Sequence, residues 1–113
     1  MFRVDSYGFG RIVINGRVYT YDVLILPDRI ERWWRKKGHR VCPEDLKEVM
    51  EEKPQILVVG RGYSGEMEVP EETVRVLGEK GIELVAEETG KAVESFNRLS
   101  KTKRVAAALH LTC

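Results

Sequence analysis

The chain has 113 residues, of which 42% are hydrophobic and 33% are charged, and its formal net charge is +1. This composition indicates one globular domain over residues 1–113 that folds without metals or disulfides, and no apolar run reaches the roughly 18 residues of a membrane-spanning helix. The N-terminal residues lack the apolar segment of a signal peptide and two cysteines are too few for a disulfide framework, so we expect a cytoplasmic location.

Charge is distributed unevenly along the chain. Residues 1–43 carry nine Lys or Arg against four Asp or Glu, whereas residues 44–113 carry ten against fourteen. Six basic residues lie within Arg29–Arg40, and five acidic residues follow within Glu44–Glu52. A basic segment can bind phosphates, but the acidic segment behind it favours internal neutralisation or a polar partner surface. Nucleic-acid binding is therefore not expected.

The first elements are β-strands. Arg11–Thr20 is typical of a hairpin, because Asn15-Gly16 accepts the positive φ angles of a two-residue type I′ turn. This register places Val13 opposite Val18. The second strand can continue through Tyr21–Leu26 until a proline stops it.

Two adjacent tryptophans follow in the segment Ile30–Trp34. In an extended chain Trp33 and Trp34 point to opposite faces, so we expect one in the core and one over a charged surface.

The organisation changes near residue 43 to alternating helices and strands. Helices are predicted to begin near Pro43, Pro70 and Thr89, because apolar residues recur on one face after each position. Apolar runs predict strands over 55–60, 82–86 and 105–111, with the last one central and its direction left open. An N-terminal hairpin or meander followed by a βαβαβ core predicts a three-layer α/β domain with right-handed crossovers.

Several short segments carry a resemblance to a known family. They are Tyr7-Gly8-Phe9-Gly10, Tyr21-Asp22-Val23-Leu24-Ile25, Arg32-Trp33, Gly60-Arg61-Gly62, Ala92-Val93-Glu94-Ser95-Phe96-Asn97 and His110-Leu111-Thr112-Cys113. In these segments the chain resembles the small domain family named after a methanobacterial hypothetical protein, "Mth nine-three-eight". Its relatives include an adipogenesis-associated protein and a mitochondrial assembly factor for respiratory complex I. The resemblance implies a mixed central sheet and a protein-binding role in assembly, and it supplies no catalytic residues. Relatives often read Gly-Thr-Gly where this chain has Arg61 between its two glycines.

The segment Gly60-Arg61-Gly62-Tyr63-Ser64-Gly65 matches the spacing of a dinucleotide-binding loop. The match fails downstream, because Glu66 and Glu68 precede the next helix and would repel a phosphate. Two interpretations stay open. Gly60, Arg61, Gly62 and Gly65 form an anion or small-ligand site, or the glycines serve only the backbone angles of the loop.

Other polar residues are candidates on weaker grounds. Asp22 interrupts an apolar strand and needs a partner if it is buried, for which Arg32 is a candidate. His39 and His110 each precede a cysteine by three residues, at Cys42 and Cys113. Neither pair has a known zinc-binding spacing, and ligation by the second pair would require a bend at Leu111–Thr112. We therefore expect no metal site and no cofactor.

Trp33, Trp34, Arg35 and Lys36 are candidates for a protein interface, because tryptophan and arginine are enriched where partners bind most tightly. The sequence thus favours a non-enzymatic protein-binding or assembly domain, acting on a protein partner or a second copy of itself. The alternative is a small-molecule or anion binder, or an enzyme, with a crevice near Gly60–Gly65. A protein-binding domain predicts an exposed aromatic patch, whereas a small-molecule binder or an enzyme predicts a deep polar pocket.

Overall fold

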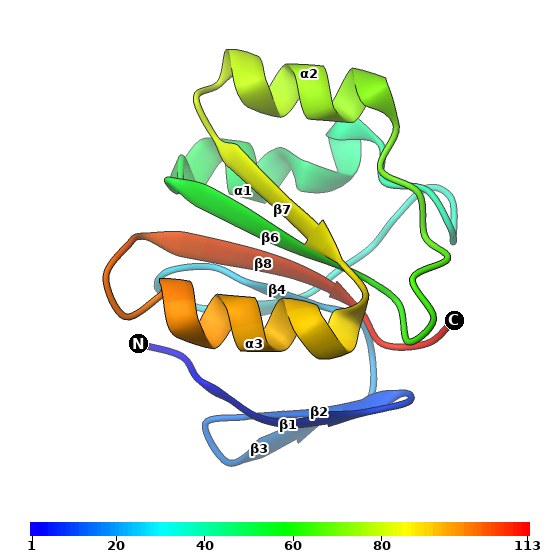
Figure 1. Cartoon of the computed structure of the whole chain (residues 1–113), viewed down its shortest axis with the longest axis vertical. Helices are drawn as coiled ribbons and strands as arrows, with labels where there is room; N and C mark the ends of the chain where they lie inside the picture. Colours follow the sequence, from blue (N-terminus) through cyan, green and yellow to red (C-terminus); the bar gives the residue numbers. More distant parts are fainter.

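The computed structural model describes residues 1–113, and its strands form two sheets (Figure 1). The smaller sheet is antiparallel, in the order β1-β2-β3, and consists of β1 (Val4–Gly8), β2 (Arg11–Ile14) and β3 (Arg17–Tyr19). The larger sheet is mixed, in the order β5-β4-β8-β6-β7, and consists of β4 (Val23–Ile25), β5 (Ile30–Arg32), β6 (Ile56–Arg61), β7 (Glu83–Glu87) and β8 (Val105–His110).

The helices lie on both faces of the larger sheet (Figure 1). One face is covered by the 3₁₀ helix η1 (Pro43–Leu46), α1 (Lys47–Glu52) and α2 (Glu71–Glu79). The opposite face is covered by α3 (Thr89–Leu99), and the smaller sheet packs beside α3 on that side. The three-layer α/β domain predicted from the sequence is confirmed. No helix combines the length and the apolar character that crossing a bilayer requires.

Alternate residues of the central strands face two separate hydrophobic cores. Leu57 and Val59 of β6 pack with the residues of η1, α1 and α2, while Ile56 and Val58 pack with α3 and the smaller sheet. This period of two follows from the pleat of a strand. β6 and β8 are uninterrupted apolar runs because both faces of these strands are covered.

The direction of the last strand is now defined. β8 lies at the centre of the larger sheet, parallel to β6 and antiparallel to β4. Ala106, Ala107 and Ala108 are completely buried. The chain reaches the carboxyl end of the sheet at His110 and leaves the strand there, which places its last residues beside the loop after β6.

The hairpin was predicted correctly, but its continuation was not. Val13 pairs with Val18, and Asn15 and Gly16 both have positive φ. The second strand ends at Tyr19, and β4 begins at Val23 in the other sheet. The interval contains Asp22, whose carboxylate bonds to groups at the end of β8 instead of continuing the strand.

Helix α2 buries only one of its faces. Its Thr73 and Leu77 are fully buried, whereas the neighbouring Val74 is 43% exposed and does not face inward.

Candidate functional site

Asp22 is the centre of a polar cluster at the carboxyl end of the sheet. Because Val23 pairs with Leu109 across antiparallel strands, the residue before β4 lies beside the last residue of β8. Oδ2 of Asp22 lies 2.8 Å from Nδ1 of His110 and accepts a hydrogen bond from Nη1 of Arg35 at 2.8 Å. Oδ1 accepts the backbone N–H of Leu111 at 2.8 Å. The carboxylate is thus held by three donors.

The surroundings of Asp22 favour its charged form. Burial by itself would raise the pKa of this carboxyl group. The hydrogen bonds from His110, the Leu111 N–H and Arg35 outweigh burial and hold the pKa below its ordinary value. The partner expected from the sequence, Arg32, was wrong, because the guanidinium that reaches Asp22 belongs to Arg35.

His110 has one ring nitrogen in use and one without a partner. The ionised Asp22 requires a donor at Nδ1, so the ring proton resides on Nδ1. Nη2 of Arg35 also approaches Nδ1, at 3.1 Å, but it donates to the carbonyl of Gly38 at 2.9 Å. Nε2 of His110 is buried and has no hydrogen-bond partner, while the side chain is only 7% exposed.

His39 and Cys113 lie beside His110. One donor atom from each of the three residues falls within 4.8 Å of the other two. The rings of His39 and His110 are 6.0 Å apart between centroids. His39 is exposed and Cys113 is half-buried, so the cluster opens towards solvent on one side. The bend after β8 that joint contact requires is present, while Cys42 lies outside this group.

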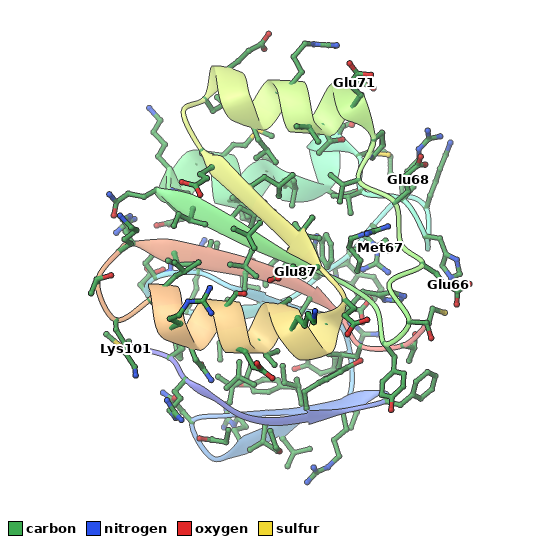
Figure 2. The ribbon with its side chains drawn as sticks, viewed as in Figure 1. Glu66, Met67, Glu68, Glu71, Glu87 and Lys101 are labelled. Atoms are coloured by element: carbon green, nitrogen blue, oxygen red, sulfur yellow. The ribbon has the colours of Figure 1, made fainter.

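Backbone pairing fixes the loop that carries His39. The carbonyl of His39 accepts the N–H of Glu68 at 2.8 Å, and the carbonyl of Glu68 accepts the N–H of Val41 at 2.9 Å. In Figure 2, Glu66 and Glu68 lie on the outside of this segment, while the buried Met67 lies further in. The loops after β5 and after β6 are thus held together.

The glycine loop Gly60–Gly65 forms one wall of this cluster. Gly62 has φ +105°, and a Cβ at this position would lie 2.5 Å from the carbonyl oxygen of Thr112 and 3.1 Å from Cδ2 of His110. Arg61 donates from Nε to the carbonyl of Met67 at 2.8 Å, which closes the loop on itself. None of the three surface cavities is lined by Gly60–Gly65. These contacts favour the backbone interpretation of the glycines over a ligand site at Arg61.

Thr89 connects the same loop to β8. It begins α3, is fully buried, and accepts the N–H of Gly62 at Oγ1 over 2.9 Å. The same hydroxyl donates to the carbonyl of His110 at 2.6 Å. The helix begins at Thr89 as predicted, with Glu88 at the cap position, and the side chain of Thr89 connects the ends of two strands.

A second group of exposed side chains lies beside the polar cluster. The guanidinium of Arg32 lies over the ring of Tyr21, 4.9 Å from its centroid, and over the ring of Trp34, 4.3 Å away. Trp34 is 71% exposed, and Tyr19 packs edge-on against Tyr21. We call Tyr21, Arg32 and Trp34 the aromatic–arginine patch. A cavity of about 330 Å³ lies against it.

One tryptophan is buried and the other is exposed, as expected, so part of the interface predicted from the sequence is not accessible. Trp33 is 4% exposed, and its Nε1–H donates to the carbonyl of Asp45 at 2.9 Å. The guanidinium of Arg35 stacks on Trp33 at 4.5 Å and its side chain is 7% exposed. Lys36 is exposed but is paired with Glu44 at 3.0 Å. Of the four interface candidates, only Trp34 offers an exposed aromatic surface.

The positions of Cys113, Thr89 and Tyr21 at these two groups of side chains could not be predicted from the sequence. The spacing of Cys113 from His110 suits neither a straight strand nor a known zinc motif, and Tyr21 lies in a run that is typical of a strand. The only signal near Tyr21 is that Asp22 interrupts this apolar run, and the only signal near Cys113 is that the apolar run of the last strand ends there.

Comparison with known proteins places the chain in a family. The family described as "Protein of unknown function (DUF498/DUF598)" matches residues 4–110. A conserved hypothetical protein from Pyrococcus horikoshii OT3 is 27% identical over 98% of this chain and 99% of its own, with a TM-score of 0.90. The protein MT938 is 27% identical over the full length of both chains, with a TM-score of 0.84.

A third structure has the same fold at lower identity. A Bordetella pertussis protein described as a Mth938-like domain is 21% identical over 96% of this chain and 85% of its own, with a TM-score of 0.71. The family match covers nearly the whole chain and the similar structures share its complete fold. The chain therefore belongs to the DUF498/DUF598 family of Mth938-like domains.

Proposed function

We propose that this domain is a non-enzymatic protein-binding module of the assembly type, and that the aromatic–arginine patch is its contact surface. The observation that carries the proposal is the stacking of Arg32 on both Tyr21 and Trp34 at the exposed surface. Tryptophan, tyrosine and arginine are the residues most often found at the energetic centres of protein interfaces. Holding the guanidinium against two rings reduces the conformational entropy that binding would otherwise cost.

The charge of the patch favours an acidic partner. Four cations of the basic segment are engaged with carboxylates, namely Arg29, Arg35, Lys36 and Arg40. Arg32 has no carboxylate partner within the chain, and neither has Lys37. A stacked guanidinium keeps the edge of its plane free, and that edge binds a carboxylate through two parallel hydrogen bonds. The partner group that fits Arg32 is an aspartate or glutamate.

The position of the patch favours an extended partner segment. Arg32 ends β5, which is an edge strand paired only with β4. An edge strand presents unpaired N–H and C=O groups to which another chain can add a strand. The adjoining cavity of about 330 Å³ has room for one side chain beside Trp34. We therefore commit to an extended acidic peptide segment of another protein as the occupant.

A cytoplasmic setting belongs to the same proposal, because both cysteines are free thiols.

Selection from a displayed random peptide library tests this proposal with the purified domain. The expected ligands are acidic peptides with an apolar residue next to an aspartate or glutamate. Their affinity, measured by fluorescence anisotropy of a labelled peptide, should fall about tenfold or more in Trp34→Ala and in Arg32→Ala. Arg32→Lys should also weaken binding, because lysine keeps the charge but loses the planar fork.

The matched control is Lys101→Ala, which removes an exposed cation in the turn between α3 and β8 (Figure 2). This variant should bind the peptides as the wild type does. Thermal melting of every variant excludes unfolding as the cause of lost binding. The proposal is overturned if no peptide is selected, or if the selected peptides bind Trp34→Ala and the wild type equally. Binding of inorganic phosphate instead of peptide, or self-association through the patch in light scattering, would also contradict it.

A further inference from the structure

We infer that His39, His110 and Cys113 form a zinc-binding site with one open coordination position. None of these three residues belongs to the aromatic–arginine patch, and the inference does not depend on the contact surface proposed above. No metal site was expected from the sequence, because neither His-x-x-Cys segment has a known zinc-binding spacing. The fold selects His39 from the first segment and both residues of the second, and leaves Cys42 elsewhere.

The first observation behind this inference is the free nitrogen of His110. Nε2 is buried without a partner, which is unusual because buried polar atoms are nearly always hydrogen-bonded. Cδ2, the ring carbon bonded to Nε2, lies on the side of the ring that faces Gly62, and a Cβ on Gly62 would also lie 2.9 Å from the backbone of Cys113. The edge of the ring that carries Nε2 and the backbone of Cys113 therefore both border Gly62. A metal ion is one of the few groups that would satisfy the free nitrogen there.

The second observation is the arrangement behind the ring. Nδ1 of His110 bonds to Oδ2 of Asp22 at 2.8 Å, and Asp22 is itself held by Arg35 and the N–H of Leu111. Metal-binding histidines characteristically donate a hydrogen bond from the N–H of their second ring nitrogen to a carboxylate, which fixes the tautomer and makes the metal-binding nitrogen more basic. Asp22 is a positioning residue in this scheme, since it acts through His110 and does not itself contact the metal.

The donor set identifies the metal. Two imidazole nitrogens and one thiolate match the borderline-soft ligands of Zn²⁺, and three protein ligands leave the fourth tetrahedral position for water or another molecule. Zinc bond lengths of about 2.0–2.3 Å imply donor separations of roughly 3.3–3.6 Å. The donors lie within 4.8 Å of one another, so closure requires movement of about an ångström. The exposed His39 and the half-buried Cys113 can supply it while His110 stays fixed.

The charged groups and the glycine loop around the three ligands are compatible with a zinc ion. The nearest strongly charged groups behind His110 are Asp22 and Arg35, which neutralise each other in an ion pair at 2.8 Å. The other wall is the glycine loop, where any side chain at Gly62 would collide with the backbone next to Cys113. Glycine at this position keeps the space beside Cys113 open.

The test is zinc binding by chelator-stripped protein under reducing conditions, measured by competition with a chromophoric chelator and by native mass spectrometry. The expected result is one Zn²⁺ per chain. Replacement by Co²⁺ should give a thiolate-to-cobalt charge-transfer band and the strong visible bands of a four-coordinate ion. In ¹⁵N spectra of histidine, the resonance of Nε2 of His110 should shift on zinc addition while Nδ1 remains protonated.

Variants distinguish this site from adventitious binding. Cys113→Ser and His39→Ala should each weaken zinc affinity about a hundredfold or more, and Asp22→Asn should weaken it by about ten- to a hundredfold. Cys42→Ser is the matched thiol control and should leave the affinity unchanged. His39 and Cys113 are at the surface, so their variants should fold, which melting curves will verify. The inference is overturned if the wild type binds no stoichiometric zinc, or if Cys113→Ser binds as tightly as Cys42→Ser.

Discussion

The imidazole of His110 and the carboxylate of Asp22 lie 2.8 Å apart, although they are 88 positions apart in the sequence. This pair joins the end of the central strand β8 to the connection between the two sheets. It also fixes the proton of His110 on Nδ1 and leaves Nε2 unpartnered. Asp22 also lines the cavity next to Trp34. The same carboxylate therefore orients His110 and borders the aromatic–arginine patch.

Replacing Asp22 should destabilise the fold strongly. Asp22→Ala leaves the side chain of Arg35, the ring N–H of His110 and the N–H of Leu111 without their acceptor. We expect a loss of about 2–4 kcal/mol in the free energy of unfolding, measured by urea denaturation. Asp28→Ala removes an exposed carboxylate from a surface ion pair and should cost less than about 1 kcal/mol. Equal losses in the two variants would contradict the central role of Asp22.

Two glycine substitutions should have opposite signs. Gly62→Ala places a Cβ 2.5 Å from the carbonyl oxygen of Thr112 at a φ of +105°, so it should destabilise by more than about 2 kcal/mol. Gly78 lies within α2 and a Cβ there meets nothing within 4 Å. Gly78→Ala should therefore stabilise by about 0.5–1 kcal/mol, because alanine favours helix. Differential scanning calorimetry of both variants measures these shifts, and a stable Gly62→Ala would refute the close approach of the two loops.

The hydroxyl of Thr89 should contribute more than its methyl group. Thr89→Val leaves the N–H of Gly62 and the carbonyl of His110 without a buried partner, which should cost about 1–3 kcal/mol. Thr89→Ser keeps both hydrogen bonds and should lose less than Thr89→Val. Hydrogen exchange of the Gly62 amide should accelerate in the valine variant and stay slow in the serine variant. The opposite order would assign the role of Thr89 to packing.

Alkaline pH should destabilise the protein through Tyr7. Burial raises the pKa of this phenol from 10.0 to about 12, and its hydroxyl donates to the carbonyl of Leu111 at 2.8 Å. A raised folded-state pKa means that the stabilising contribution is complete below pH 10 and is lost as the pH rises towards 12.

Urea denaturation at several pH values tests this linkage with Tyr7→Phe. The variant should lose less stability than the wild type between pH 10 and 12, because it has no phenol to ionise. Tyr63→Phe, which removes a 56% exposed phenol, is the control and should follow the wild type. The same slope in the wild type and in Tyr7→Phe would contradict the assignment.

Sequence alone determined the parts of this protein that depend on local chemistry. Asn15 and Gly16 accept positive φ, so they specify the hairpin turn and with it the pairing of Val13 with Val18. The continuous apolar run of Ile56–Val59 predicts a strand covered on both faces. Family membership could also be predicted from the sequence, because short motifs that resemble the family are distributed over the whole chain.

Only the tertiary structure decided which distant side chains meet. The pairing of β4 with β8 brings Asp22 to His110, and no local pattern specifies that register. The bend after β8 sets Cys113 beside His39, and the face of β5 decides that Arg32 stacks on Trp34 while Arg35 reaches Asp22. Such contacts follow from packing between elements far apart in the sequence. For that reason the sequence located the glycine loop correctly but could not show that the polar chemistry beside it belongs to the ends of β4 and β8.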